Sequence, residues 1–211
     1  MKFNKFNNED DQERIWDAIA EQWFHFRQQR NVDVEYFFNR YCKNKGEKCS
    51  ILDIGCGNSR NLLNFAKSGF KCYGIDFSKE MIRFSHRFIK RHNIKVILKK
   101  ANMLKIPFKD NYFDYALMVA SLHHIKEEDH LKALKELNRV LKRKGISIVS
   151  VWKKPLKDAC TSWKVKDKIY DRYYYFFKEQ ELKDLILKAG FKILEDYSNK
   201  NIVFIVKKID D

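Results

Sequence analysis

A glycine turn set between two acidic residues could bind a nucleoside. Gly55 and Gly57 follow the apolar run 50–54, so the backbone there can turn tightly and approach a ligand where a Cβ atom would collide. Asp76 ends the next apolar run, 19 positions after Gly57, where a carboxylate can accept hydrogen bonds from a ribose diol. Arg60 occupies the third glycine position of a dinucleotide-binding turn, which argues against hydride chemistry.

Asp53, two positions before the first glycine, indicates the kind of nucleoside. A carboxylate beside the turn suits a cofactor with a cationic amino-acid group better than one with a phosphate. S-adenosylmethionine has that character. A glycine turn can also be purely structural, but the combination of Asp53 and Asp76 favours a cofactor site.

Strands and helices must alternate to bring these residues together. Period-two and continuous apolar runs predict strands at 50–54, 70–76, 96–98, 113–119, 146–152, 191–197 and 202–207. Helical periods predict helices at 11–30, 34–41, 59–67, 78–93, 127–141 and 179–189. The last two strands are joined by a linker of about four residues, too short for a crossover, so they must be antiparallel.

The expected fold is therefore α/β, a Rossmann-like seven-stranded mostly parallel sheet with helices on both faces and an antiparallel last strand pair. We expect one domain over residues 1–211. It comprises N-terminal helices (1–47), a cofactor-binding core (48–152), a substrate-side insert (153–178) and a closing helix with strands (179–207).

Composition excludes several classes of protein. The 211 residues are 45% hydrophobic, with two prolines and no apolar run near the length of a membrane span, which favours a globular domain. The first ten residues show no secretory pattern, so we expect the cytoplasm or nucleus. Five cysteines without a Cys-x-x-Cys pair argue against a disulfide framework or a zinc site in this chain. We expect reduced, mostly buried thiols at Cys42, Cys49, Cys56, Cys72 and Cys160.

The net charge of +15 is concentrated in the middle of the chain, with +9 over residues 31–100. Arg83, Arg87 and Arg91 recur every four positions beside His86 and Lys90, so they share one helix face. Such a stripe can simply be a solvated surface. Together with the charge of the whole chain, it favours a nucleic-acid partner.

The segments 52–58, 73–76 and 113–114 make the chain resemble the class I S-adenosylmethionine-dependent methyltransferases over roughly residues 48–207. The resemblance implies that Asp53, Gly55 and Gly57 line the methionine end of the cofactor and that Asp76 holds the ribose. It also implies that a residue pair after the third strand binds the adenine. That pair is Asn102 and Met103, where the family more often has Asp at the first position; an Asn carbonyl can still accept from the adenine amino group. The cofactor-binding set is completed by Cys56, Phe77 and Ala120.

Four segments outside the cofactor turn, 26–30, 120–124, 171–182 and 201–208, resemble the tRNA wobble-uridine carboxymethyl methyltransferases. Members of that family esterify the carboxylate of 5-carboxymethyluridine at the anticodon wobble position. The sequence departs from the family at Tyr175, where His is usual, and at Gln180, where Gly is usual. The resemblance implies two partners, the anticodon loop of a tRNA and a small zinc-binding activator subunit, and hence a heterodimer.

Arg30, His123 and Arg172 are the predicted catalytic residues. A carboxylate acceptor is ionised at pH 7 and needs no strong general base, but it needs a cationic clamp, and Arg30 and Arg172 match family positions able to supply one. His123 follows the fourth strand, where methyl group and acceptor should meet; a core histidine is its alternative. A surface ion pair with Glu179 is the alternative for Arg172. Adjacent histidines diverge in extended chain, so we expect no metal site at His123 and His124.

Two other functions stay open. One is a small-molecule methyltransferase acting on a quinone precursor or a carboxylic acid. The other is a cofactor-binding scaffold that assists a partner without catalysis. The aromatic run 173–177 is expected to be partly core and partly available to stack on an unpaired base.

Overall fold

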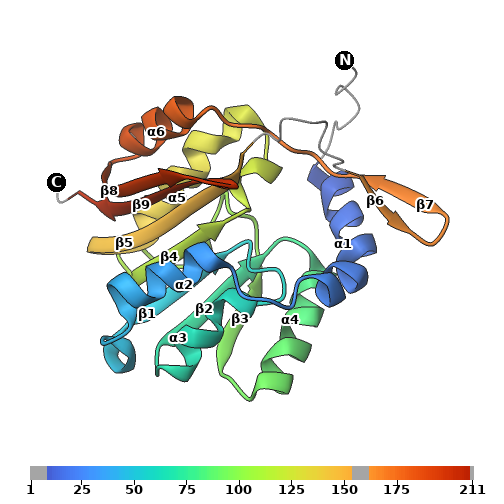
Figure 1. The fold of residues 1–211 in the computed structure, drawn as a ribbon, viewed down its shortest axis with the longest axis horizontal. Coiled ribbons are helices and arrows are strands. Elements are labelled where there is room, and N and C mark those ends of the chain that lie inside the picture. The colour runs from blue at the N-terminus through green and yellow to red at the C-terminus, as the bar shows by residue number, and fades with distance from the viewer. Residues whose placement is uncertain (1–8, 154–161, 210–211) are drawn as a thin grey trace.

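A computed structural model describes residues 9–153 and 162–209. Its seven-stranded sheet has the order β3-β2-β1-β4-β5-β9-β8 (Figure 1). Five strands are parallel, and β9 runs antiparallel to both β5 and β8, which confirms the predicted topology. The strands are β1 (Ser50–Ile54), β2 (Lys71–Asp76), β3 (Val96–Lys100), β4 (Phe113–Val119), β5 (Leu141–Trp152), β8 (Phe191–Ser198) and β9 (Asn201–Lys208).

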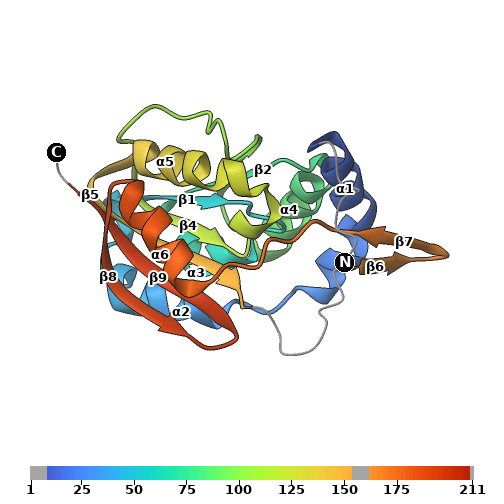
Figure 2. The same ribbon diagram turned by 90° about the horizontal axis from the view of Figure 1, so that it is seen from above.

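Helices cover both faces of this sheet, as Figure 2 shows for α5 above it and α2 below it. The helices are α1 (Glu9–Phe26), α2 (Val32–Phe37), α3 (Leu63–Lys67), α4 (Lys79–His92), α5 (His130–Val140) and α6 (Glu179–Lys188). Because side chains alternate along a strand, Ile51 packs in the core under α2 and α3, whereas Leu52 packs under α5 and α6. Both side chains are fully buried.

Helix α4 begins where the sequence predicts and is joined to α1 at that point. The Ser78 hydroxyl accepts a 3.0 Å hydrogen bond from the amide of Met81 and donates one of 2.5 Å to Asp17 of α1. Asp17 also accepts from the amide of Glu80, so α1 supplies a negative charge at the positive end of α4. The two helices share a third apolar core that contains Trp16 and Phe84.

Several segments differ from the sequence prediction: α2, α3 and β3 have other bounds than predicted, and three differences are larger. Helix α1 ends at Phe26, four residues before the predicted boundary, and β5 begins at Leu141, inside the predicted helix 127–141. The predicted insert contains a short antiparallel hairpin, β6 (Ser162–Val165) and β7 (Lys168–Asp171), which projects beside α1 (Figure 1). Its two strands of four residues are too short for their alternation to stand out from the surrounding aromatic and basic residues.

The described cysteines are free thiols, and Cys42, Cys56 and Cys72 are buried as predicted. Cys160 lies outside the described residues, as does residue range 154–161 of the predicted insert. Within the described ranges no helix combines the length and the apolar character needed to cross a membrane.

Candidate active site

A cavity of about 400 Å³ opens at the carboxyl ends of β1, β2, β3 and β4. The glycine turn forms its floor, with left-handed φ angles of +74° at Gly55 and +53° at Gly57. A Cβ atom on Gly55 would lie 2.5 Å from Cβ of Ser121, and one on Gly57 would lie 2.7 Å from the ring of Trp23. Glycine is therefore required at both positions for two reasons: the backbone conformation is left-handed, and a Cβ atom would collide with a neighbouring side chain.

Asp76 lies on the cavity wall and is bonded to the glycine turn. One carboxylate oxygen accepts a 2.9 Å hydrogen bond from the amide of Gly57, and the other accepts one of 3.0 Å from the amide of Ser78. Burial raises the pKa of Asp76 to about 6, although these amides favour the charged form. Each oxygen keeps a second lone pair, so the carboxylate can still accept hydroxyl groups of a ribose.

Asp53 is the last but one residue of β1, before the turn, and is fully buried. It does not line the cavity, so the expectation that it lines the methionine end of the cofactor is wrong: it lies behind the lining residues of the turn. Neither of its carboxylate oxygens has a hydrogen-bond partner. Burial raises the pKa of Asp53 to about 7, Asp76 adds to the rise, and Arg60 opposes it. A buried carboxylate without a partner is costly, and a cationic group bound above the turn would offset that cost. These residues therefore fit a cofactor with a cationic amino-acid end.

Arg60, which the sequence presents only as an obstacle to a dinucleotide, lines the cavity. Its guanidinium carbon lies 5.5 Å from the centroid of the Trp23 ring. Burial and the nearby Arg27 lower the pKa of Arg60 to about 10, and Asp53 raises it. Arg60 is thus charged at neutral pH and can face the carboxylate of a bound amino-acid group.

The opposite wall of the cavity is built by the ends of β2 and β3. Phe77, Asn102 and Met103 line it, as the sequence predicts, together with Ala101. The side-chain carbonyl of Asn102 already accepts a 2.9 Å hydrogen bond from the amide of Leu104. This bond fixes the side chain, and the oxygen has a second lone pair for an amino group of the ligand.

Ala120 and Ser121 close the cavity after β4, where Ala120 has a φ of +53°. Such a conformation is uncommon for a residue with a Cβ atom and is held by a 2.9 Å hydrogen bond from the amide of Ala120 to the carbonyl of Ser150. The bend turns the chain into a 3₁₀ turn, Leu122–His124. Both neighbouring histidines therefore lie on this turn rather than on extended strand.

His124, and not His123, reaches the cavity wall. Nδ1 of His124 lies 3.1 Å from the carbonyl oxygen of Tyr173. A carbonyl can only accept, so Nδ1 carries the proton. Burial lowers the pKa of His124 to about 3, which leaves the ring neutral and Nε2 a bare hydrogen-bond acceptor.

His123 is fully buried, and its Nδ1 accepts a 3.3 Å hydrogen bond from the amide of Trp152. Its ring stacks on Tyr174 with centroids 5.1 Å apart. The two histidine rings are 4.3 Å apart, so the expectation that they diverge as in extended chain is wrong. The 3₁₀ turn is the reason, because it rotates successive side chains by about a third of a circle rather than a half.

The two predicted arginines are not brought together at the cavity. Because α1 ends at Phe26, the following chain carries Arg30 to the surface, where it pairs with Glu35 at 3.1 Å and donates to Asn64. Arg172 is 4% exposed, behind the wall. Its guanidinium carbon lies between 5.1 and 5.4 Å from the ring centroids of Trp16, Trp163 and Tyr174. The alternative of a surface ion pair with Glu179 does not describe this environment.

Helix α1 contributes a wall that sequence reasoning missed. Gln12, Glu13, Trp16 and Trp23 line the cavity, and Gln12 accepts a 2.9 Å hydrogen bond from the amide of Tyr173. The tryptophans follow the helical period of core residues, so the sequence does not distinguish them. Two further contributors, Ser121 and Tyr173, stand beside predicted site residues and could have been included on that ground.

Comparison with known proteins agrees with this geometry. Residues 52–149 match the family model described as "Methyltransferase domain". Demethylmenaquinone methyltransferase of Geobacillus stearothermophilus is 30% identical over 160 residues, covering 73% of this chain and 61% of that protein. The chain spans 56 to 61% of the length of the first curated relatives it matches.

Two solved structures share the fold. Burkholderia thailandensis 1,6-didemethyltoxoflavin-N1-methyltransferase, solved with S-adenosylhomocysteine, has a TM-score of 0.73 at 16% identity, over 99% of this chain and 94% of that one. The [4+2]-cyclase SpnF also has a TM-score of 0.73, at 15% identity, over 94% of this chain and 95% of that one. These two likenesses show the shared fold; the matched methyltransferase domain and the fit of the cavity to the cofactor support a class I S-adenosylmethionine-dependent methyltransferase.

Proposed function

We propose that the chain transfers a methyl group from S-adenosylmethionine to an acceptor held beside His124 and Tyr173. The observation that carries the proposal is the joining of the glycine turn to Asp76, above the unpartnered carboxylate of Asp53. When bound, the cofactor supplies an electrophilic methyl group on its sulfonium. The residues of this chain bind and orient the two reactants and exclude water, which can supply much of a methyl-transfer rate.

Binding and turnover test this proposal separately. Titration calorimetry with S-adenosylhomocysteine should give a saturable one-site isotherm, and labelled S-adenosylmethionine should transfer its methyl group to an acceptor. Binding without transfer to any acceptor would favour the scaffold hypothesis. The likeness to a protein named a cyclase makes the transfer assay necessary, because a fold alone does not determine a reaction.

A small-molecule acceptor has the better support from the comparisons. The relative and the solved methyltransferase named above carry the names of enzymes for a menaquinone precursor and a toxoflavin precursor. The neutral ring of His124 adds a physical argument. Its bare Nε2 can accept a hydrogen bond from a hydroxyl or N–H nucleophile, whereas it would repel the lone pairs of a carboxylate.

The second candidate is esterification of 5-carboxymethyluridine at the wobble position of a tRNA. Its support comes from the exposed basic face of α4 and from the cluster of aromatic rings with Arg172 behind the cavity. The positions of Arg30 and Arg172 weigh against it, since neither lines the cavity where a carboxylate would need a clamp.

One experiment distinguishes the two acceptors. Nucleoside mass analysis of tRNA from cells that lack the protein should reveal accumulated carboxymethyluridine if tRNA is the acceptor. An unchanged nucleoside profile, together with methyl transfer to a quinone precursor or another phenolic acceptor in vitro, would establish the small-molecule function instead.

We also propose a small zinc-binding activator subunit as partner. Strand β3 is an edge strand of the sheet, and Ile97 on it is 53% exposed; an edge with exposed apolar residues supports pairing with a second chain. Co-expression with such a subunit should raise soluble yield and cofactor affinity. Full activity and solubility of the isolated chain would contradict this proposal.

A further inference from the structure

The wall that faces the adenine side of the cavity is an irregular loop. Residues 101–112 join β3 to β4 without a helix or strand, and Ala101, Asn102 and Met103 at its start line the cavity. Loops of this kind sample several conformations unless other elements hold them. The position of the wall therefore depends on what fixes the rest of the loop.

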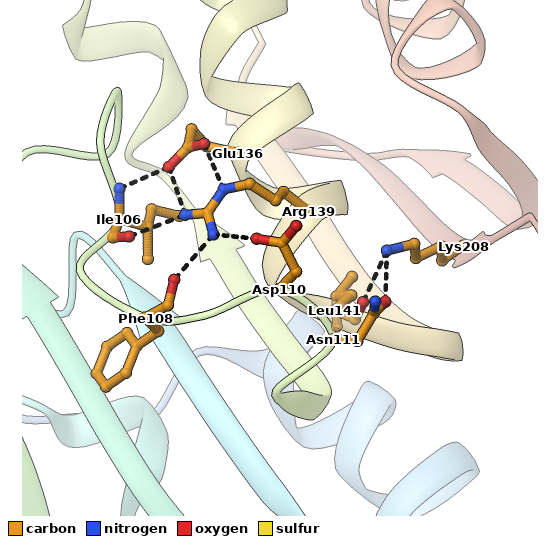
Figure 3. Close-up of polar contacts among 8 residues, drawn as sticks. All are labelled: Ile106, Phe108, Asp110, Asn111, Glu136, Arg139, Leu141 and Lys208. Carbon is orange, nitrogen blue, oxygen red and sulfur yellow. Dashed lines mark hydrogen bonds and ion pairs between the residues drawn. The ribbon is translucent and has the colours of Figure 1, made fainter.

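Arg139 of α5 is the main contact that fixes the middle of this loop (Figure 3). Its guanidinium donates to the carbonyl of Ile106 at 2.9 Å, to the carbonyl of Phe108 at 2.8 Å and to the carboxylate of Asp110 at 2.7 Å. One planar group thus holds three positions of the loop at once, which a lysine cannot do.

Glu136, one turn earlier on α5, orients this arginine and binds the loop itself. Its carboxylate accepts from Arg139 at 2.7 and 2.8 Å. It also accepts a 2.7 Å hydrogen bond from the amide of Ile106. Figure 3 shows the loop residues converging on the Glu136–Arg139 pair. The pair holds both the amide and the carbonyl of Ile106.

A short chain of contacts links Ile106 to the cavity wall. The amide of Lys105 donates to the carbonyl of Asn102 at 3.1 Å, and the amide of Leu104 donates to the Asn102 side chain. Asn102 is thus held in a turn that ends one residue before Ile106, and the Ile106 side chain is itself 2% exposed. A loop released at Ile106 would release this turn as well.

We propose that Arg139 is a positioning residue for the adenosyl part of the cofactor. It holds Asn102 and Met103 in the conformation that lines the cavity, and it acts through the loop without touching the ligand. The inference rests on the proposed function for the identity of the cofactor. When the loop adopts its binding conformation only part of the time, the apparent dissociation constant rises in inverse proportion to that fraction.

Arg139→Lys tests the inference, with Arg139→Gln as a second variant. We expect S-adenosylhomocysteine to bind about tenfold more weakly if the loop is ordered about a tenth of the time. The loss should be equal for 5′-methylthioadenosine, which lacks the amino-acid end. In turnover, KM for the cofactor should rise while kcat at saturation stays unchanged. Amide hydrogen exchange should quicken within residues 101–112.

Lys142→Met is the matched control. Lys142 donates to both carboxylate oxygens of Asp114 at 2.9 Å, so this variant also removes a bidentate charge pair. That pair lies at the amino ends of β4 and β5, whereas the cavity lies at the carboxyl ends. A similar loss of affinity in the control would show general destabilisation and overturn the inference. Unchanged exchange of residues 101–112 in Arg139→Lys would also overturn it, whether or not cofactor binds. If the unaltered chain binds no adenosyl ligand, the proposed function fails, and that result is distinct from the exchange result.

Discussion

The amide of Gly57 donates a 2.9 Å hydrogen bond to the carboxylate of Asp76, which joins the turn after β1 to the end of β2. The glycine turn and Asp76, which are 19 residues apart in the sequence, are therefore in direct contact in the structure. The amide of Ser78 binds the other oxygen of the same carboxylate, so the N-terminus of α4 belongs to this unit too. A change at any of these positions should disturb the cofactor site before it disturbs the fold.

Gly57→Ala should strongly weaken binding of S-adenosylhomocysteine while the protein stays folded. The new Cβ atom would meet the ring of Trp23 at 2.7 Å, and Trp23 lines the cavity. Gly69→Ala is a suitable control, because Gly69 also has a left-handed φ, of +84°, but meets only the side chain and backbone of Glu47. Both variants carry a conformational cost of about 1 kcal/mol. Titration calorimetry should show reduced affinity only for Gly57→Ala; equal reductions would refute a steric role.

Asp53 should make the cofactor-free protein less stable as the pH rises. Its pKa is raised from 3.8 to about 7 in the folded chain, so the folded state binds more protons than the unfolded state between these values. The free energy of unfolding therefore falls across this window and levels off above it. Asp53→Asn should remove this fall, a difference on the order of 4 kcal/mol between pH 4 and pH 8.

Chemical denaturation at several pH values measures the effect, and Asp114→Asn gives a control of opposite sign. Lys142 and Ser50 lower the pKa of Asp114 against the effect of its burial, so the ionised Asp114 stabilises the fold above its unfolded pKa. Its replacement should cost stability at pH 7 and little in acid. A pH dependence of the same sign for the two variants would contradict the assignment of Asp53. Asp53→Asn should also weaken cofactor binding, which a scaffold without catalysis would tolerate.

His124→Phe should lower kcat for a hydroxyl acceptor about tenfold, because one orienting hydrogen bond is lost, with the affinity for S-adenosylhomocysteine unchanged. The reason is that His124 lines the cavity and that the carbonyl of Tyr173 holds the proton of its Nδ1, which leaves Nε2 as the hydrogen-bond acceptor of the ring. Because the pKa of His124 is about 3, its titration should leave the rate unchanged between pH 5 and pH 9. Steady-state kinetics over this range checks both points. His123→Phe should mainly lower the melting temperature; a selective loss of kcat there would reverse the roles given to the two residues.

All seven strands of the sheet could be predicted from the sequence, and two of them to the residue. β1 and β4 have the predicted bounds, Ser50–Ile54 and Phe113–Val119, because a strand buried on both faces is a continuous apolar run. The cofactor residues could be predicted too, since they stand at fixed positions relative to those strands. Gly55, Gly57 and Asp76 all line the cavity.

The acceptor side could not be predicted because it depends on contacts between distant segments. Whether His123 or His124 reaches the cavity is decided by a 3₁₀ turn after Ala120, which leaves no clear pattern in the sequence. The place of Arg172 depends on rings from α1 and from the β6–β7 hairpin. Sequence spacing cannot predict which side chains from distant segments come into contact. The structure accordingly does not place Arg30 and Arg172, the predicted clamp, on the cavity wall.

The salt dependence of the acceptor KM distinguishes the two candidate acceptors, because the basic face of α4 would contact a tRNA but not a small neutral molecule. Arg87 and Arg91 are exposed on this helix, and Arg87→Gln with Arg91→Gln removes two charges without touching the cavity. If the acceptor is tRNA, its KM should rise steeply between 50 and 200 mM salt, and the double variant should flatten the logarithmic slope by roughly 0.9 for each phosphate that the protein no longer neutralises. Lys188→Gln with Lys192→Gln, at the edge of the sheet where β8 begins, is the control of equal charge. A small neutral acceptor should give the same KM in all three proteins at every salt concentration, because no counterions are released when it binds.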